Sequence, residues 1–306
     1  MSEEPAAPFV TVVVTTRNRK DELRACLDSI ARQDYPAEVI VVDDASQDGT
    51  PETVAADYPD VVLIRHAAPR GYICGRNEAA RAATGAIIVS IDDDAVFSTG
   101  RIVRHTVAAF SDARVGAVAI PYVDVNRGSD VRQLAPDSVG VYVVNAFIGT
   151  AHAVRRDVFL ALGGYREQLF HQGEESDFCI RMLAAGYVVR AGTSDPIHHF
   201  ESPRRDFDRM DLYGPRNALL FVYQNVPLPS AIWRLASTVA GVLAWTADST
   251  RLVTRLRGIA AAARAMPTCA RAPVPGPVHS LWRRLQAAEP PLTLPAIAAQ
   301  LPALRS

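Results

Sequence analysis

The chain has 306 residues, of which 49% are hydrophobic and 21% are charged, so it can build a core and is not disordered as a whole. Its 32 basic and 33 acidic residues give a formal net charge of −1. This balance argues against a dedicated nucleic-acid binder, which would carry a strong basic excess. The length predicts one domain of ordinary size with an extension.

The cysteines and the first residues predict a cytoplasmic protein. Four cysteines lie far apart without a CxxC pair, which indicates free thiols in a reducing compartment rather than a disulfide framework or a zinc site. The N-terminus lacks the basic and apolar segments of a secretory signal. The longest uncharged apolar run late in the chain, residues 235–247, is shorter than the ~18 residues that suggest a membrane span.

Apolar runs alternate with helical patterns over the first ninety residues. Strands are predicted at residues 9–15, 39–42, 61–64 and 86–91, and helices at residues 20–33, 50–58 and 76–83. This alternation predicts an α/β fold with a mostly parallel central sheet and helices on both faces. Ligands bind at the carboxyl ends of the strands in such sheets. Polar clusters follow the first, second and fourth predicted strands here, which favours a binding site at that edge.

The remaining chain is predicted to form three further sets of elements. Strands at residues 115–120 and 141–147 and helices at residues 156–162 and 178–185 complete an α/β domain over residues 1–204. Residues 205–266 form a helical extension, with Ala-, Leu- and Arg-rich helical stretches at residues 214–223 and 230–265. Eight of the 21 prolines lie from Pro267 onward, which predicts a loosely structured tail over residues 267–306.

Three adjacent carboxylates, Asp92, Asp93 and Asp94, follow the fourth predicted strand. They repel one another, so a positive partner is favoured. Mg²⁺ and Mn²⁺ prefer oxygen ligands and often share them with substrate phosphates. Asp92 and Asp94 point the same way in an extended segment and can therefore converge on one ion. The alternative is a solvated acidic turn.

Two further acidic clusters each have a functional and a structural interpretation. Asp43 or Asp44, at the end of the second strand, can hydrogen-bond a base or a ribose; the same segment also suits a turn and a helix N-cap. Glu174, Glu175 and Asp177 begin a predicted helix. They either favour the helix dipole or supply a general base to a hydroxyl.

Adjacent histidines, His198 and His199, follow a Ser-Asp-Pro turn. A histidine can complete the coordination of an ion that carboxylates hold, although paired histidines are also common in cores and on surfaces. Several familiar sites are missing from the sequence. It has no GxxxxGK[ST] phosphate loop, no GxGxxG dinucleotide fingerprint and no GxSxG nucleophile elbow.

Six segments, read in order over residues 8–203, resemble the glycosyltransferase family 2 enzymes. These are inverting transferases with the GT-A-type nucleotide-sugar-binding fold. The six segments are VTVVVTTRNR, VVDDASQDGT, PRGYICGRNEAARAATGAIIVSIDDDA, GTAHAVRRDVFLALGGYRE, GEESDFCIRMLAAGY and PIHHFES. Each segment is weak alone, but their common order makes the resemblance specific.

The resemblance implies which residues bind the donor, a nucleoside-diphosphate sugar. Thr15, Arg17 and Asp44 match the positions that hold the nucleotide base, with Asp44 accepting a hydrogen bond from N3–H of the base. Arg76 matches an arginine near the donor, and Asp93, in the middle of the triplet, is grouped with these donor-binding residues.

The resemblance also implies a metal site for Mn²⁺ or Mg²⁺. Asp92 and Asp94 match the outer carboxylates of the DxD motif, which holds the metal on the donor diphosphate. The family has a histidine ligand as well, and the doubled histidine leaves two candidates. His199 is preferred over His198.

The catalytic residues implied by the resemblance begin the predicted helix near residue 178. Glu174 and Glu175 match an acidic pair whose second member is the general base, and Asp177 matches a further acidic position. Glu175 stands where the family usually has aspartate. The implied reaction is a metal-dependent transfer of a sugar to an acceptor hydroxyl, with inversion, in polysaccharide, glycolipid or other glycoconjugate synthesis.

Two other functions compete with this interpretation. The segment VSIDDDAV also fits the motif of haloacid-dehalogenase-like phosphohydrolases, with Asp92 as nucleophile and Asp94 as acid/base. That family usually has a downstream lysine, whereas Lys20 is the only lysine of this chain. The second alternative is a catalytically inactive protein that binds a nucleotide sugar.

The predicted helical stretch at residues 230–265 has an apolar side and arginines. Ile232, Leu235, Val239, Val242 and Leu243 recur at helical spacing, with Trp233 and Trp245 nearby and arginines at positions 251, 255 and 257. Such a helix can lie on an anionic membrane surface, at the inner face of the membrane. Packing on the catalytic domain, or contact between two copies in a homodimer, explains the same pattern.

Overall fold

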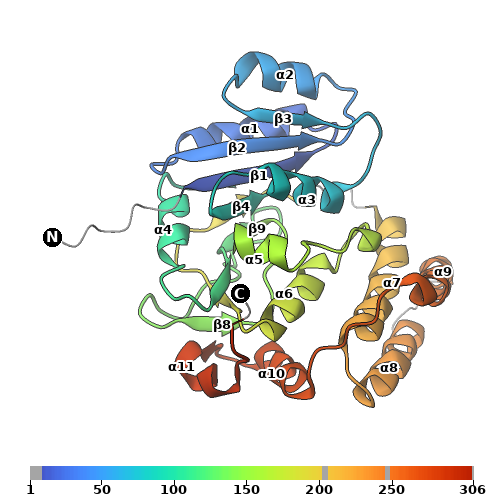
Figure 1. The fold of residues 1–306 in the computed structure, drawn as a ribbon. Helices are drawn as coiled ribbons and strands as arrows, with labels where there is room; N and C mark the ends of the chain where they lie inside the picture. Colours follow the sequence, from blue (N-terminus) through green and yellow to red (C-terminus); the bar gives the residue numbers. More distant parts are fainter. Residues whose placement is uncertain (1–8, 202–205, 245–248, 305–306) are drawn as a thin grey trace.

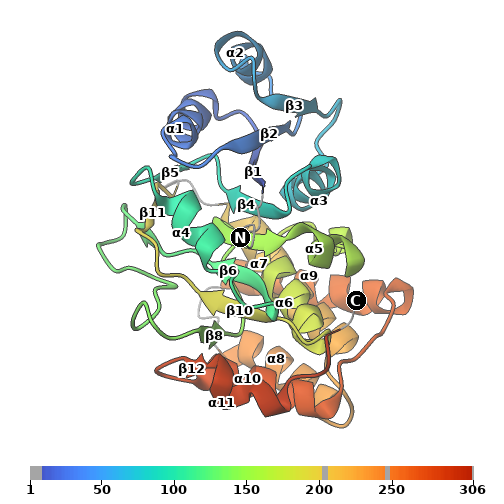
Figure 2. The same ribbon diagram turned by 60° about the vertical axis from the view of Figure 1, so that its left-hand side comes forward.

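The computed structural model describes residues 9–201, 206–244 and 249–304. A nine-stranded sheet forms the centre, with the strand order β12-β8-β10-β6-β9-β4-β1-β2-β3, and Figure 2 shows β3 and β12 at its opposite ends. Its strands are β1 (Val10–Thr16), β2 (Ala37–Asp43), β3 (Val62–Arg65), β4 (Ile87–Ile91), β6 (Val115–Ala119), β8 (Tyr142–Val144), β9 (Ala151–Arg155), β10 (Val188–Ala191) and β12 (Leu292–Thr293). A second sheet joins β5 (Ala95–Phe97), β11 (Ile197–His199) and β7 (Tyr122–Asp124).

The central sheet is parallel in its N-terminal half and mixed beyond it. Strands β4, β1, β2 and β3 are parallel neighbours. Strand β9 runs antiparallel to β4 and β6, and β8 runs antiparallel to β10 and β12. Parallel neighbours need a crossover connection, usually a helix, between one strand and the next. Residues 142–155 carry two strands with no helix between them, so the alternation of strands and helices stops there. The predicted α/β class is confirmed. Parallel pairing joins the first four strands, and beyond them it joins only β6 and β10 among the described strands of this sheet.

Eleven α-helices occur in the described part of the chain (Figure 1). They are α1 (Lys20–Ala31), α2 (Thr50–Asp57), α3 (Tyr72–Ala82), α4 (Ile102–Ala108), α5 (Arg156–Ala161), α6 (Glu174–Ala184), α7 (Phe207–Asn225), α8 (Ser230–Ala244), α9 (Ser249–Ala265), α10 (Gly276–Ala287) and α11 (Leu294–Ile297). Helix α1 buries Leu23, Cys26, Leu27 and Ile30 on one side, as its 3.6-residue periodicity predicts.

The edge where β1, β2 and β4 end carries the polar clusters. Strand β4 is buried throughout, because its Ile and Val side chains pack against layers on both faces. It stops at Ile91, immediately before the three aspartates. The in-register pairing of β1 with β2 and β4 brings the residues after these strands to one edge of the sheet.

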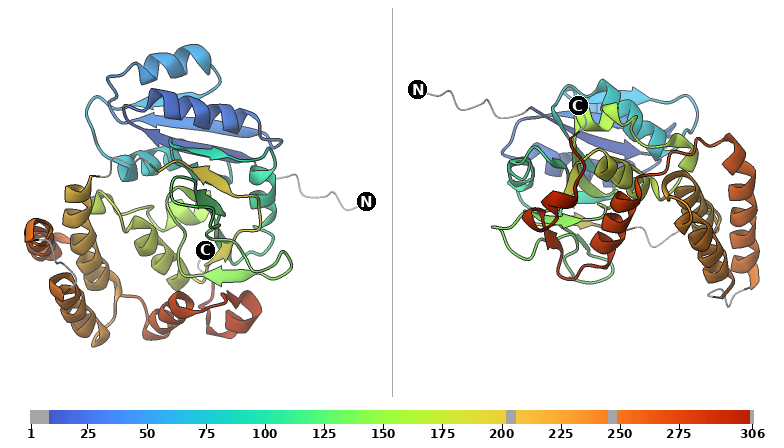
Figure 3. Two further views of the ribbon diagram at one scale, coloured as in Figure 1. Left: turned by 180° about the vertical axis from the view of Figure 1, so that it is seen from behind. Right: turned by 60° about the horizontal axis from the view of Figure 1, so that its bottom comes forward.

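Helices α7, α8 and α9 form a group beside the sheet domain (Figure 3). Helix α9 approaches α7 very closely at Gly258, where a Cβ atom would lie 2.3 Å from the backbone oxygen of Leu212. Only glycine permits this separation. The predicted stretch at residues 230–265 is divided between α8 and α9, and Trp245 lies outside the described residues.

The segment after Pro267 differs from the expected loosely structured tail. Helix α10 buries Val278, Leu281, Trp282 and Leu285, and β12 pairs with β8 at the end of the central sheet. Pro277 and Pro295 lie in the first turns of α10 and α11, where proline is tolerated because its missing N–H has no helical partner there. Proline content alone therefore gave a wrong prediction for this segment.

Among the described residues, no helix combines the length and apolar character that crossing a membrane requires.

Candidate functional site

A cavity of about 1090 Å³ opens at the carboxyl ends of β1, β2 and β4 and extends to α6, α7 and α9. Nine of the twelve residues predicted for the site line it, and they come from segments far apart in the sequence. These nine are Thr15, Arg17, Asp44, Arg76, Asp92, Asp93, Asp94, Glu175 and His199. Glu174, Asp177 and His198 are not among the lining residues.

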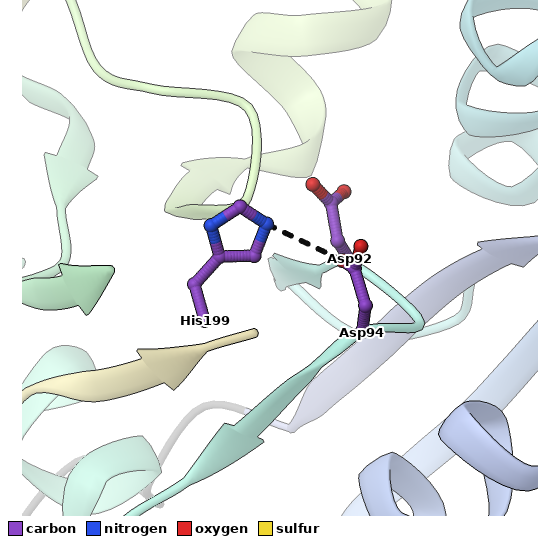
Figure 4. Close-up of side chains that lie close together, drawn as sticks. All are labelled: Asp92, Asp94 and His199. Atoms are coloured by element: carbon purple, nitrogen blue, oxygen red, sulfur yellow. Dashed lines mark ion pairs between the residues drawn. The ribbon is translucent and has the colours of Figure 1, made fainter. Parts of the chain in front are cut away.

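One end of this cavity has a group of side chains that fits a divalent cation. Asp92, Asp94 and His199 each offer one ligand atom, and these atoms lie within 4.8 Å of one another (Figure 4). Two carboxylates and an imidazole are a donor set that Mn²⁺ and Mg²⁺ accept. The antiparallel register of β11 with β5 pairs His199 with Ala95, the residue after the triplet, and so holds the histidine beside the aspartates.

A neighbouring carboxylate orients His199. Its Nδ1–H donates to Oδ1 of Asp124 at 2.5 Å, and Nε2 lies 3.3 Å from Oδ1 of Asp94. A hydrogen bond of this kind fixes the tautomer and the ring plane of a metal-ligating histidine. His198, the neighbour in β11, projects to the other side of the strand. The structure therefore favours His199 and not His198 as the third member of the group.

The middle residue of the triplet, Asp93, is turned toward the protein interior. Thr16 donates a hydrogen bond to Oδ2 at 2.8 Å, and Arg19 donates to Oδ1 at 2.9 Å. Burial raises the pKa of Asp93 to about 7, although the Arg19 guanidinium opposes this shift. Arg19 also donates to Asp94 at 2.6 Å. Asp93 thus anchors the triplet to the end of β1 through Thr16 and to the start of α1 through Arg19, a residue that the sequence analysis did not select.

Asp44 is held rigidly where β2 ends. Its carboxylate accepts from the backbone N–H groups of Arg70 and Gly71 at 2.7 and 2.9 Å and from His66 Nδ1 at 2.8 Å. Burial alone would raise the pKa of Asp44, but these hydrogen bonds lower it. His66 also contacts Glu78 through Nε2 at 2.9 Å. Sequence analysis missed His66, although its position two residues after the third predicted strand was a signal.

The buried guanidinium of Arg76 connects the metal-binding end of the cavity to α6. Its Nη2 donates to Asp92 at 2.6 Å and to the carbonyl oxygen of Gly149 at 3.0 Å. Its Nη1 lies 3.4 Å from Glu174, and the guanidinium stands over the ring of Tyr72. Arg76 therefore places a positive charge at the floor of the cavity.

The two glutamates at the start of α6 have different surroundings. Glu175 lines the cavity, whereas Glu174 is fully buried beside Arg76. Burial raises the pKa of both carboxyls, and Arg76 opposes the shift in each case. Oε1 of Glu175 lies close to Gly149, since a Cβ atom built on that glycine would be 2.8 Å from it. Glu175 is thus the only one of the two that faces the cavity.

Asp177, which the sequence analysis grouped with the catalytic residues, lies inside the protein. Oδ1 accepts from Arg166 at 2.6 Å and from Asn225 at 2.8 Å, and Oδ2 accepts from Arg181 at 3.0 Å. Its side chain is 1% exposed. Since two residues along a helix rotate the direction of a side chain by about 200°, Glu175 and Asp177 cannot face the same cavity. Asp177 connects α6 to the end of α7.

We expect Asp177→Ala to lower the free energy of unfolding by about 3–5 kcal/mol, because it leaves two arginines without their buried carboxylate. Urea unfolding followed by circular dichroism measures this loss. Asp57→Ala, which removes an exposed ion pair with Arg24, is the matched control and should change stability by less than about 1 kcal/mol. Unchanged stability together with lost activity would return Asp177 to the catalytic group.

The sequence matches the family model of Glycosyl transferase family 2 over residues 11–182, more than half of the chain. The chain belongs to glycosyl transferase family 2. The matched residues run from β1 into α6 and include every cavity-lining residue named above except His199. The predicted family and enzyme class are therefore confirmed, and the haloacid-dehalogenase-like alternative is wrong.

Curated glycosyltransferases are similar to this family 2 chain to different extents. The uncharacterized glycosyltransferase YwdF of Bacillus subtilis is 35% identical over 221 residues, which cover 69% of this chain and 81% of YwdF. Glycosyltransferase AglE of Haloferax volcanii is 32% identical over 28% of this chain and 31% of its own length. The pre-mycofactocin glycosyltransferase of Mycobacterium tuberculosis is 28% identical over 71% of this chain. The match spans only 48% of that mycobacterial protein.

Solved glycosyltransferase structures share the fold. A mannosyltransferase of Pyrobaculum calidifontis, in complex with GDP-Man and Mn²⁺, has a TM-score of 0.59 and 25% identity and covers 93% of this chain. This alignment includes 88% of the mannosyltransferase chain. Residues 1–349 of TarS from S. aureus, in complex with UDP-GlcNAc, have a TM-score of 0.61 and 16% identity, over 91% of this chain and 87% of TarS. The GT-A-type fold of this family 2 member is confirmed.

Proposed function

We propose that this family 2 protein transfers a sugar from a nucleoside-diphosphate sugar to an acceptor hydroxyl, with inversion and with a divalent metal. The observation that carries the proposal is the shared cavity. It holds the Asp92, Asp94 and His199 group together with the carboxylate of Glu175. Arg76 connects the two, since it donates to Asp92 and to the carbonyl oxygen of Gly149, and Glu175 lies beside the Cα of the same glycine.

In the proposed reaction, the acceptor oxygen forms a bond to the anomeric carbon as the bond from that carbon to the diphosphate breaks. Glu175 takes the acceptor proton, and the nucleoside diphosphate leaves with the bonding electrons. A bound Mn²⁺ or Mg²⁺ would supply positive charge to the departing diphosphate. Burial raises the pKa of Glu175, which makes its carboxylate a stronger base near neutral pH.

The donor nucleotide is assigned to the edge formed by β1 and β2. Asp44 presents a carboxylate whose position is fixed by two backbone N–H groups and His66. Thr15 and the exposed Arg17 line the same side of the cavity. The carboxylate of Asp44 is a hydrogen-bond acceptor that is already held in place. It suits an N–H group of a nucleotide base, since an oriented group loses little entropy on binding. The products are assigned to polysaccharide, glycolipid or other glycoconjugate synthesis.

A panel of nucleoside diphosphates and nucleotide sugars, measured by thermal shift with and without Mn²⁺, tests the proposal. The matching donor at a hundredfold excess over its dissociation constant should stabilise the folded state by about 2.7 kcal/mol. The stabilisation should require Mn²⁺, and the matching nucleoside monophosphate is the control. If no member of the panel stabilises the protein, the proposal is wrong. If a donor binds but is neither transferred nor hydrolysed, the protein is the inactive sugar-nucleotide binder considered above.

A further inference from the structure

Helix α8 has one side packed on the protein and one side without charge that faces solvent. Ala231 is buried, and Leu235 and Val239 pack against the hydrophobic core. The opposite side is uncharged over three turns of helix. Its exposed residues are Ile232, Trp233, Ala236, Ser237, Ala240, Leu243 and Ala244. We call this side the α8 apolar face.

The large side chains of the α8 apolar face are unusually open to solvent. Trp233 is 77% exposed and Ile232 is 61% exposed, and Leu228, just before the helix, is 66% exposed. Isolated exposed apolar residues are ordinary, but a contiguous group marks an interaction surface. The predicted apolar stripe of this region is therefore divided: Leu235 and Val239 serve the core, and Ile232 and Trp233 do not.

The sequence around this face has a strong positive charge. Residues 226–288 contain eight arginines and a single acidic residue, a net charge of +7, whereas the rest of the chain carries −8. The net charge of the whole chain is near zero only because the positive charge of this segment and the negative charge of the rest cancel. A cationic region with an apolar side matches an anionic partner that also has an apolar interior.

Part of this charge lies next to the α8 apolar face. Arg234 lies on α8 itself. Burial of Arg234 lowers its pKa, and the positive charge of the nearby Arg283 on α10 lowers it further. In the described part of the chain, Arg234, Arg283 and Arg284 make no ion pair with a carboxylate. Arg251 and Arg255, by contrast, are paired with Asp211 of α7 and hold α9 in place.

We propose that the α8 apolar face docks onto the surface of a bilayer that contains anionic phospholipid. Leu228, Ile232 and Trp233 enter the boundary between headgroups and acyl chains, where the indole ring of tryptophan is favoured. Arg234 and Arg283 lie beside the lipid phosphates. A second copy of the chain is a poorer occupant, because self-association through this face would bring Arg234 and Arg283 of the two copies together.

Co-sedimentation of the full chain with vesicles tests the docking. Vesicles of mixed phosphatidylglycerol and phosphatidylcholine should carry the protein into the pellet at low salt, and vesicles of phosphatidylcholine alone should not. Binding should weaken as salt screens the charges. The double variant Ile232→Ser with Trp233→Ser should lower the partition coefficient at least about tenfold. Arg283→Glu should lower binding only to the anionic vesicles.

Val139→Ser is the matched control, since Val139 is 90% exposed but lies far from α8 in the sequence and should not affect binding. Nucleotide-dependent thermal stabilisation, measured on every variant, verifies that the cavity is intact and is independent of the docking result. Wild-type protein that stays in the supernatant with anionic vesicles overturns the proposal. A double variant that binds them as tightly as the wild type also overturns it. A dimer detected by light scattering, and lost in the double variant without any vesicle binding, would assign the face to a second copy instead.

Discussion

Glu175→Gln should lower the rate of sugar transfer by about 10²–10⁴-fold and leave donor affinity largely unchanged. The substitution keeps the size of the side chain and its hydrogen bonding but removes its ability to take a proton. Glu175 is the only acidic residue of the α6 N-terminal turn that lines the cavity. Initial rates with a saturating donor, together with the dissociation constant of the donor, separate the loss of the base from a loss of binding.

Two glutamates serve as controls for this experiment. Glu201→Gln alters another glutamate of the same cavity, one that is paired with Arg127, and should have a much smaller effect on the rate. Glu174→Gln removes a buried partner of Arg76 and should change stability more than the rate. If Glu174→Gln abolishes transfer and Glu175→Gln is mild, the base is Glu174.

Asp94→Ala should abolish Mn²⁺-dependent binding of the donor diphosphate and leave the fold intact. Loss of a group that only orients a ligand costs about 10–100-fold in metal affinity, so loss of a ligand itself should cost at least about a hundredfold. The fold should survive because Arg19 keeps its hydrogen bond to Asp93. Calorimetric titration of the nucleoside diphosphate, with and without Mn²⁺, measures the effect.

Asp93→Asn is the matched control, because it changes the middle member of the same triplet. Its oxygens contact Thr16 and Arg19 and are not part of the Asp92, Asp94 and His199 group. It should alter stability and leave the Mn²⁺ dependence in place. Unchanged Mn²⁺-dependent affinity in Asp94→Ala would refute the metal site.

Much of the cavity could be predicted because strand ends are visible in the sequence. Asp44 and the triplet directly follow buried apolar runs, and parallel strands bring such positions to one edge. Repulsion within the triplet then indicates a cation without knowledge of the rest of the fold. The residues alone could not decide whether Asp44 binds a nucleotide or only forms a turn. The family resemblance made that choice.

The residues that sequence analysis missed act through contacts between distant segments. Arg19 reaches Asp93 across 74 positions, and Asp124 reaches His199 across 75. The contact between Asp124 and His199 depends on β7 and β11, whose three residues each carry too little periodicity to predict. Asp177 is a different case: the family resemblance grouped it with Glu175, whereas helix geometry directs its side chain away from Glu175 and into the protein.

The close crossing at Gly258 has a consequence for the movement of the acceptor. Helix α9, through Thr254 and Arg257, and helix α7, through Met210 and Tyr213, both line the cavity. Their backbones touch at Gly258 and Leu212, and α8 packs on both helices. The cavity entrance and the α8 apolar face therefore keep a constant separation and tilt. If the α8 apolar face docks as proposed, an acceptor anchored in the bilayer would have to span this fixed separation to bring its hydroxyl to Glu175.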